Sequence, residues 1–121
     1  MHKILLVDDE PDILETLKEL VEDQFDCSID TASSGLDAFV LCGKSKYDLI
    51  ITDHKMPLMT GSAFIMATRT KENLNQKTPF IMLSGFIDDQ MKSELSGHQV
   101  EFLNKPVFPT TLFSSIENKL S

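Results

Sequence analysis

The sequence predicts an α/β protein in which five parallel strands alternate with five helices. Short apolar runs, such as residues 4–7 and 49–51, stop abruptly at polar residues and are too short to be helices. Between them lie segments whose apolar residues recur every three or four positions, which is typical of amphipathic helices. This alternation over 121 residues indicates a parallel sheet with helices on both faces. We expect one domain, residues 1–121.

The first third of the chain supplies two strands and two helices. Residues 4–7 form the first strand, and Pro11 can open the next helix at its first turn. One face of that helix carries Ile13, Leu14, Leu17, Leu20 and Val21. Residues 27–32 form a second strand, which is less apolar and therefore expected at an edge of the sheet. Residues 36–42 form a short helix. We expect three of its side chains to face inward, namely Leu36, Phe39 and Val40.

The third strand is the stretch around which the chemistry is organised. The run of residues 49–51 is uniformly apolar, which is typical of a buried parallel strand, and the strand ends on Asp53. A proline and Gly61 punctuate the following loop, so no helix can begin directly after the strand. A helix over about residues 62–74 follows, with Thr60 as its N-cap.

The remaining chain continues the alternation. Residues 79–83 form a fourth strand, and residues 86–95 form a helix that Gly97 stops. Residues 100–103 form the fifth strand. Pro109 opens the last helix, whose apolar face is Leu112, Phe113, Ile116 and Leu120.

Composition and charge exclude several classes of function. Lys and Arg total 11 against 19 Asp and Glu, so the net charge is −8. This charge argues against binding of nucleic acid or an anionic membrane by this chain alone. No apolar stretch approaches the roughly 18 residues of a membrane span. The chain runs straight into a strand, so we expect no signal peptide. Cys27 and Cys42 lack metal-binding or redox spacing. We expect a cytoplasmic protein.

Reactive side chains follow four of the predicted strands. Asp8 and Asp9 follow the first, Asp53 the third, Ser84 the fourth and Lys105 the fifth. In a parallel sheet these groups meet at one edge. Two ionised carboxylates ~5 Å apart repel by roughly 3 kcal/mol at an effective dielectric of ~20, so the three require cations.

A magnesium ion would supply the charge that a single lysine does not. Oxygen ligands with open positions suit Mg²⁺, which keeps several waters and is usually completed by a phosphate. A carboxylate beside Mg²⁺, a lysine and a hydroxyl can accept a phosphoryl group. The predicted acceptor is Asp53.

These residues resemble one family over essentially the whole chain. The sequence is similar to the response-regulator receiver domains of two-component signalling, of the stand-alone, single-domain type. In this order and spacing the motifs are specific: residues 6–10, then Asp53 with Met56, Pro57 and Gly61, then Ser84 and Gly85, then Lys105 and Pro106. The resemblance implies a flavodoxin-like fold with strand order 2-1-3-4-5.

The resemblance also implies how the metal is held. Asp9 and Asp53 would coordinate Mg²⁺ through their carboxylates and Asp8 largely through water. Lys55 would contribute its backbone carbonyl. His54 adjoins Asp53, but neighbouring side chains in an extended segment point opposite ways, so we do not expect it to be a ligand.

The phosphoryl group and its switch follow from the same resemblance. Asp53 would accept the group from a phosphohistidine, Lys105 would bridge to it, and Ser84, which replaces the more frequent Thr, would hydrogen-bond it. Phe102 matches the aromatic switch position. The bond between Lys105 and Pro106 matches the family's usual cis peptide.

The implied partners are proteins. The phosphodonor would be a sensor histidine kinase or a histidine phosphotransfer protein. Output would be a protein contact through the face of the fourth helix, fifth strand and fifth helix, with Phe108 as an exposed anchor, and phosphorylation could also drive dimerisation. The protein would not be an enzyme beyond its own phosphorylation and dephosphorylation.

Three other classes of protein would require features that this sequence lacks or contradicts. A haloacid-dehalogenase-type phosphatase would place a second Asp where Lys55 stands and would add a cap. A flavin-binding module would need a Ser, Thr or Gly-rich loop after the first strand, where Asp8 and Asp9 would instead repel phosphate. A degenerate receiver that only binds proteins would lack Asp53 or Lys105.

Overall fold

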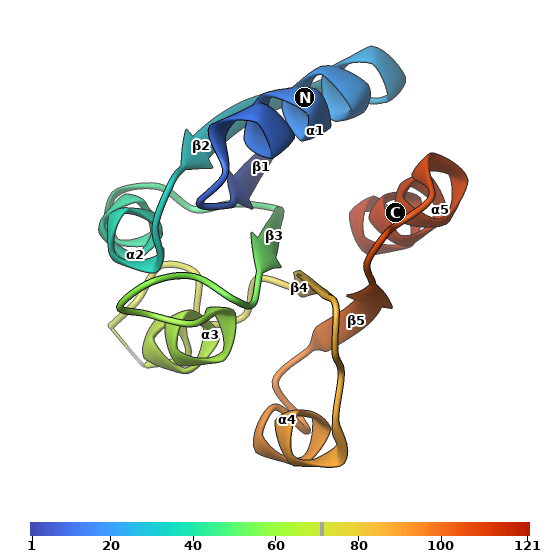
Figure 1. Ribbon diagram of the computed structural model, residues 1–121. Helices are drawn as coiled ribbons and strands as arrows, with labels where there is room; N and C mark the ends of the chain where they lie inside the picture. The colour runs from blue at the N-terminus through green and yellow to red at the C-terminus, as the bar shows by residue number, and fades with distance from the viewer. Residues whose placement is uncertain (71) are drawn as a thin grey trace.

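The computed structural model describes residues 1–70 and 72–121, and in these residues five parallel strands form one sheet flanked by five helices (Figure 1). The strand order is β2-β1-β3-β4-β5, which confirms the predicted fold class and topology. The strands are β1 (His2–Val7), β2 (Cys27–Ala32), β3 (Leu49–Asp53), β4 (Phe80–Ser84) and β5 (Val100–Asn104).

The helices cover both faces of the sheet. They are α1 (Pro11–Gln24), α2 (Gly35–Lys44), α3 (Gly61–Thr68), α4 (Asp89–Glu94) and α5 (Pro109–Leu120). Helices α1 and α5 lie on one face, and α2, α3 and α4 on the other (Figure 1). None of the helices in the described residues is long and apolar enough to cross a membrane.

Successive side chains of a strand point to opposite faces of the sheet and pack into the two halves of the core, one on each face. In β1, Ile4 and Leu6 pack with α1 and α5, whereas Leu5 and Val7 pack with α2, α3 and α4. Every residue of β3 and β4 is buried, which explains why each strand begins with a continuous apolar run rather than an alternating pattern. The edge strands β2 and β5 are only partly buried. The expected edge position of β2 is confirmed.

Two helix faces differ from the prediction. In α2, Leu36 and Val40 are exposed, and Ala38 and Cys42 fill the core with Phe39 packed partly against it. The side of α2 that faces the core carries Ala38 and Cys42, and Leu36 and Val40 lie on the outward side. Ile13 of α1 is also exposed, because the buried stripe of that helix is narrower than its apolar sequence.

Helix α3 is shorter than predicted and ends at Thr68; Lys71, within the predicted helix, lies outside the described residues. Asn75 explains the early end. Its buried side chain accepts from the Tyr47 N–H (2.8 Å) and donates to the carbonyls of Cys42 and Ser45. These bonds draw the chain back toward α2 instead of letting it continue as a helix.

Helix α4 begins three residues later than predicted. Asp88 caps it by accepting the Met91 N–H (2.8 Å), so the helical residues start at Asp89. The preceding Phe86 belongs to the loop and is exposed. A local side-chain bond therefore sets this boundary, where apolar periodicity alone does not.

Other local predictions are confirmed. Thr60 caps α3 through the Ala63 N–H (3.2 Å), and the bond between Lys105 and Pro106 is cis. Phe108 is exposed, as expected for an anchor.

Candidate phosphoacceptor site

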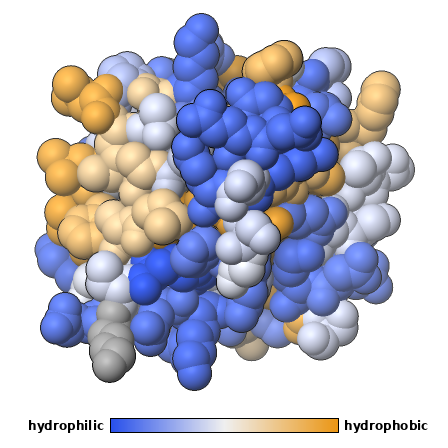
Figure 2. Space-filling model, turned by 90° about the horizontal axis from the view of Figure 1, so that it is seen from below, coloured by the Kyte–Doolittle hydropathy of each residue, from blue (hydrophilic) through white to orange (hydrophobic). Residues whose placement is uncertain are grey.

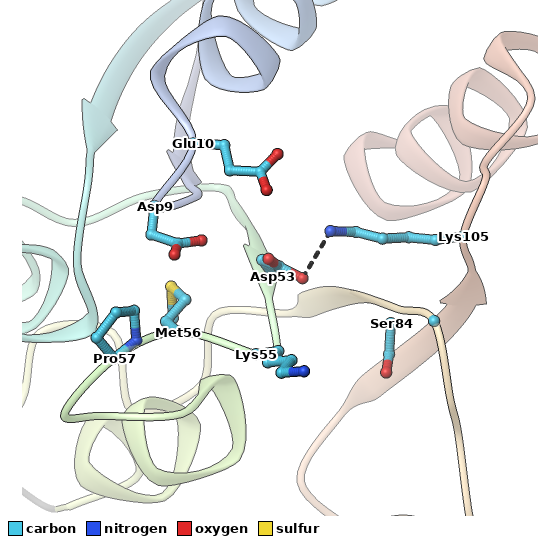
Figure 3. A pocket seen from close by; sticks show the side chains of 9 residues that line it. Asp9, Glu10, Asp53, Lys55, Met56, Pro57, Ser84 and Lys105 are labelled. Carbon is cyan, nitrogen blue, oxygen red and sulfur yellow. Dashed lines mark ion pairs between the residues drawn. The ribbon is translucent and has the colours of Figure 1, made fainter.

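The carboxyl ends of four adjacent strands build the candidate site. Register pairs Val7 with Thr52 and Asp53 with Leu83, so the residues that end β1, β3 and β4 lie side by side. A cavity of about 650 Å³ opens at this edge. Its lining is Asp9, Glu10, Asp53, Lys55, Met56, Pro57, Ser84, Gly85 and Lys105 (Figure 3).

Three carboxylates gather at the cavity. Asp8, Asp9 and Asp53 each offer an oxygen, and these atoms all lie within 4.8 Å of one another. Asp8 and Asp53 are buried, and Asp9 is more accessible. One oxygen of Asp8, Oδ2, is buried without a hydrogen-bond partner among the described residues. A buried, unpartnered carboxylate oxygen is costly, and a cation with its bound water would satisfy it.

The surroundings of Asp8 disfavour its charge. Burial raises the pKa of Asp8 above its ordinary value, and the charges of Asp53 and Asp9 act in the same direction. The hydrogen bond from the Glu10 N–H and the charge of Lys105 oppose them without cancelling them. The surroundings of Asp8 therefore supply less positive charge than its ionised form requires.

Lys105 is the cation that reaches this cluster. Its Nζ lies 2.9 Å from Asp53 Oδ1 (Figure 3). The same oxygen accepts the His54 backbone N–H at 2.9 Å. Burial lowers the pKa of Lys105, but the hydrogen bond and charge of Asp53, with the charges of Asp8 and Glu10, raise it overall. Lys105 is thus held positive beside Asp53.

The Ser84 hydroxyl faces away from Asp53 and Lys105 (Figure 3). Its Oγ donates to the Phe86 carbonyl (2.8 Å) and accepts the Phe86 N–H (3.2 Å). Ser84 lies at the cavity as predicted, but its hydroxyl is occupied by the following loop. Phe102, the predicted switch residue, is partly buried against the core under α2, α3 and α4.

Gly61 lets α3 begin directly beneath the end of β3. A Cβ at this position would lie 2.4 Å from the Asp53 carbonyl oxygen and 2.9 Å from His54 Cα. The Gly61 N–H also donates to the His54 carbonyl (2.8 Å). Because Gly61 has no side chain, the end of the loop that carries Lys55 can approach the backbone of Asp53 and His54 closely.

The His54 ring is turned toward α3. Its Nδ1 lies 3.3 Å from Ser62 Oγ, and His54 does not belong to the cluster of carboxylates. Four further residues line the cavity to which the sequence assigns no role: Glu10, Met56, Pro57 and Gly85. Their signal was present in the quoted motifs, but only the fold shows that they form one wall.

The fold and the arrangement of this site define a signalling receiver domain. A model of the response regulator receiver domain matches residues 4–117, and the chain belongs to this family, which serves two-component phosphorelay systems. In structure it is similar to the chemotaxis protein CheY4 of Vibrio cholerae, with 31% identity, a TM-score of 0.89 and 99% of each chain covered.

Similarity to curated proteins points the same way. The probable transcriptional regulator ycf29 of Porphyra purpurea is 34% identical over 97% of this chain and 56% of its own length. Response regulator Rre1 of Synechocystis is 30% identical over 98% of this chain and 51% of its own length. The chain spans about half the length of these relatives.

Proposed function

We propose that Asp53 accepts a phosphoryl group from a phosphohistidine on a sensor histidine kinase or histidine phosphotransfer protein. The observation that carries this proposal is the contact between Lys105 Nζ and Asp53 Oδ1 (2.9 Å) within a cluster of three carboxylates. Asp53 is a nucleophile on the wall of an open cavity, with a fixed positive charge beside it. Such a site stabilises the charge of a phosphoryl group during transfer.

The donor set fits Mg²⁺. Asp9 and Asp53 would bind the ion through carboxylates, Asp8 largely through water and Lys55 through its backbone carbonyl. The unpartnered Oδ2 of Asp8 supports this assignment, because a metal-bound water would satisfy it. When bound, the ion supplies positive charge opposite Lys105 and orients the phosphoryl oxygens.

The reaction requires no proton from Asp53. A carboxylate oxygen of Asp53 attacks phosphorus, the bond from phosphorus to the donor imidazole nitrogen breaks, and its electron pair returns to the imidazole. Lys105 holds Asp53 in position before transfer and pairs with a phosphoryl oxygen afterwards. The product is an acyl phosphate on Asp53.

Phosphorylation would then operate the switch. The new group adds about −1.5 to −2 charge and three acceptor oxygens. Ser84 would leave Phe86 to donate to one of these oxygens, and Phe102 would enter the space released. The readout would be a protein contact, or phosphorylation-linked dimerisation, on the face of α4, β5 and α5, where Phe108 is exposed. The two free cysteines suit a cytoplasmic location.

We assign no turnover of a separate substrate to this chain, which would act as a single receiver domain over residues 1–121. The decisive experiment is incubation with phosphoramidate and Mg²⁺, followed by intact mass spectrometry. Wild type should gain one phosphoryl group, and Asp53→Asn should gain none. Phosphate on Asp53→Asn, or none on wild type, would contradict the assignment.

A further inference from the structure

An exposed apolar surface lies on the opposite flank from the α4, β5 and α5 face. We call it the α2–α3 face and define it by Leu36, Val40, Leu58, Ala63 and Met66, all exposed. In Figure 2 apolar side chains gather on the side of the molecule where α2 and α3 lie in Figure 1. Leu36 and Val40 are four residues apart and therefore share one side of α2.

Leu58 is the most distinctive member of this face. It is fully exposed and has a φ of 68°, a left-handed conformation that residues other than Gly, Asn and Asp seldom adopt. Leu58 therefore bears backbone strain while its side chain gains no burial within the chain. Its neighbour Met59 packs against the start of α2 at Gly35, which joins Leu58 to the α2–α3 face.

The charges around this surface match a second copy of the same chain. Helix α3 contains no charged residue, although the chain as a whole carries a net charge of −8. On α2, Asp37 lies in the first turn and Lys44 in the last. The ion pairs in the described part of the chain involve neither of them.

A two-fold axis perpendicular to α2 would set the two α2 helices antiparallel. Asp37 of one copy would then face Lys44 of the other, twice, with Val40 between the two ion pairs and Leu36 just beyond them. The apolar α2–α3 faces of the two copies would contact each other, and the other surfaces, which carry most of the negative charge, would stay apart. We propose that the α2–α3 face forms a two-fold dimer with a second copy of this chain.

This dimer needs neither phosphate nor Mg²⁺, so it goes beyond the proposed function and is tested in the absence of both. Sedimentation velocity over a range from micromolar to millimolar protein should show mass rising from 13.6 kDa toward twice that value. A wild type that stays monomeric throughout, or grows past the dimer, overturns the proposal.

Two kinds of variant test the surface itself. Leu58→Asn keeps a residue that tolerates the left-handed conformation and should raise the dimer dissociation constant at least tenfold. Lys44→Asp should also weaken the dimer, at least fivefold, and the double variant Asp37→Lys with Lys44→Asp should restore it. Failure of the double variant to restore association overturns the two-fold arrangement.

Controls separate this face from others. Phe108→Ser alters an exposed aromatic residue on the opposite flank and should leave the dissociation constant unchanged. Thermal melts by circular dichroism should show that each variant stays folded. Loss of the dimer in Phe108→Ser, with retention in Leu58→Asn, would overturn the proposal.

Discussion

The Ser84 hydroxyl is bonded to both backbone groups of Phe86, donating to its carbonyl at 2.8 Å and accepting its N–H at 3.2 Å. These bonds close a tight turn at the end of β4. Asp88, which caps α4, follows two residues after Phe86. For Ser84 to reach a group on Asp53, both bonds must break. The loop before α4 is therefore released whenever the hydroxyl moves.

Energies indicate that Ser84 cannot operate the switch alone. A hydrogen bond to a charged oxygen contributes about 1.5–3 kcal/mol, and the lost bonds to Phe86 offset part of it. Moving a two-state equilibrium from 1:99 to 99:1 takes roughly 5.5 kcal/mol. Lys105 must share the work, or the unphosphorylated protein already populates the active state.

We predict that Ser84→Ala still accepts phosphate on Asp53 but fails to move Phe102. The hydroxyl is absent, whereas the acceptor carboxylate and Lys105 remain. NMR shifts at Phe102 with a beryllofluoride phosphate mimic provide the measurement. Ser114→Ala, an exposed site on α5, is the matched control and should shift as wild type does. A full shift in Ser84→Ala would rule out this coupling.

Lys105→Ala should destabilise the metal-free protein by about 1–3 kcal/mol, because it removes a charged hydrogen bond from Asp53. Millimolar Mg²⁺ should recover part of the loss by supplying another cation. Signalling should fall further than in Ser84→Ala. Urea denaturation with and without Mg²⁺ measures the first two effects, with the exposed Lys77→Ala as control. An equal loss in both conditions would argue against a shared electrostatic role.

Millimolar Mg²⁺ should raise the unfolding temperature of the wild type, since it binds the native state alone. Asp53→Asn should be more stable than wild type without metal, because one repelling charge is gone, and should gain less from Mg²⁺. Differential scanning calorimetry gives both values. Asp23→Asn on the exposed side of α1 should retain the full response. A melt that ignores Mg²⁺ would count against the metal site.

Gly61→Ala should cost about 1–3 kcal/mol through overpacking, because its Cβ would lie 2.4 Å from the Asp53 carbonyl oxygen. The displaced loop should also slow phosphorylation by a small-molecule donor. Gly43→Ala is the matched control, since a Cβ there meets nothing within 4 Å. That change should stabilise α2 by up to about 1 kcal/mol. Urea denaturation of both variants tests the contrast.

The β5 and α5 pair of Glu101 and Lys119 should make stability depend on pH. Burial raises the pKa of Glu101, but hydrogen bonds from Lys119 and Ser115 outweigh it and lower the pKa below 4.5. A carboxyl group whose pKa is lowered in the folded state stabilises the fold at any pH above its ordinary pKa. This contribution is lost as the pH falls through the pKa of the folded state. Glu101→Gln should thus be less stable than wild type at pH 7, and the difference should shrink as the pH falls through the lowered pKa of Glu101. Exposed Glu117→Gln should show no such convergence.

Local sequence was sufficient to predict where the strands end and that Asp53 lies at the edge of the sheet. The apolar run that ends at Asp53 must be buried on both faces, and a carboxylate can follow it only where the sheet opens to solvent. The same reasoning brought Asp8, Asp9 and Lys105 to that edge. These positions depend on burial along one strand at a time, which a sequence records directly.

Tertiary structure decided which face of a helix is buried and where side chains point. Leu36 and Val40 are as apolar as core residues, yet α2 buries Ala38 and Cys42 instead. The periodicity of a sequence predicts which side of a helix is apolar, but it does not predict how much room the neighbouring elements leave for those side chains. Likewise, Asn75 ends α3 through bonds to residues about 30 positions away.

In the site, too, some features follow from the sequence and others only from the tertiary structure. Sequence determined that Ser84 would lie beside Asp53, because both end neighbouring buried strands. Only the structure shows that the hydroxyl is held by Phe86, and that Gly61 is required by a backbone passing beneath it. Strand termini follow from the hydrophobic pattern, whereas rotamers and close backbone contacts depend on neighbours that the folded chain brings together.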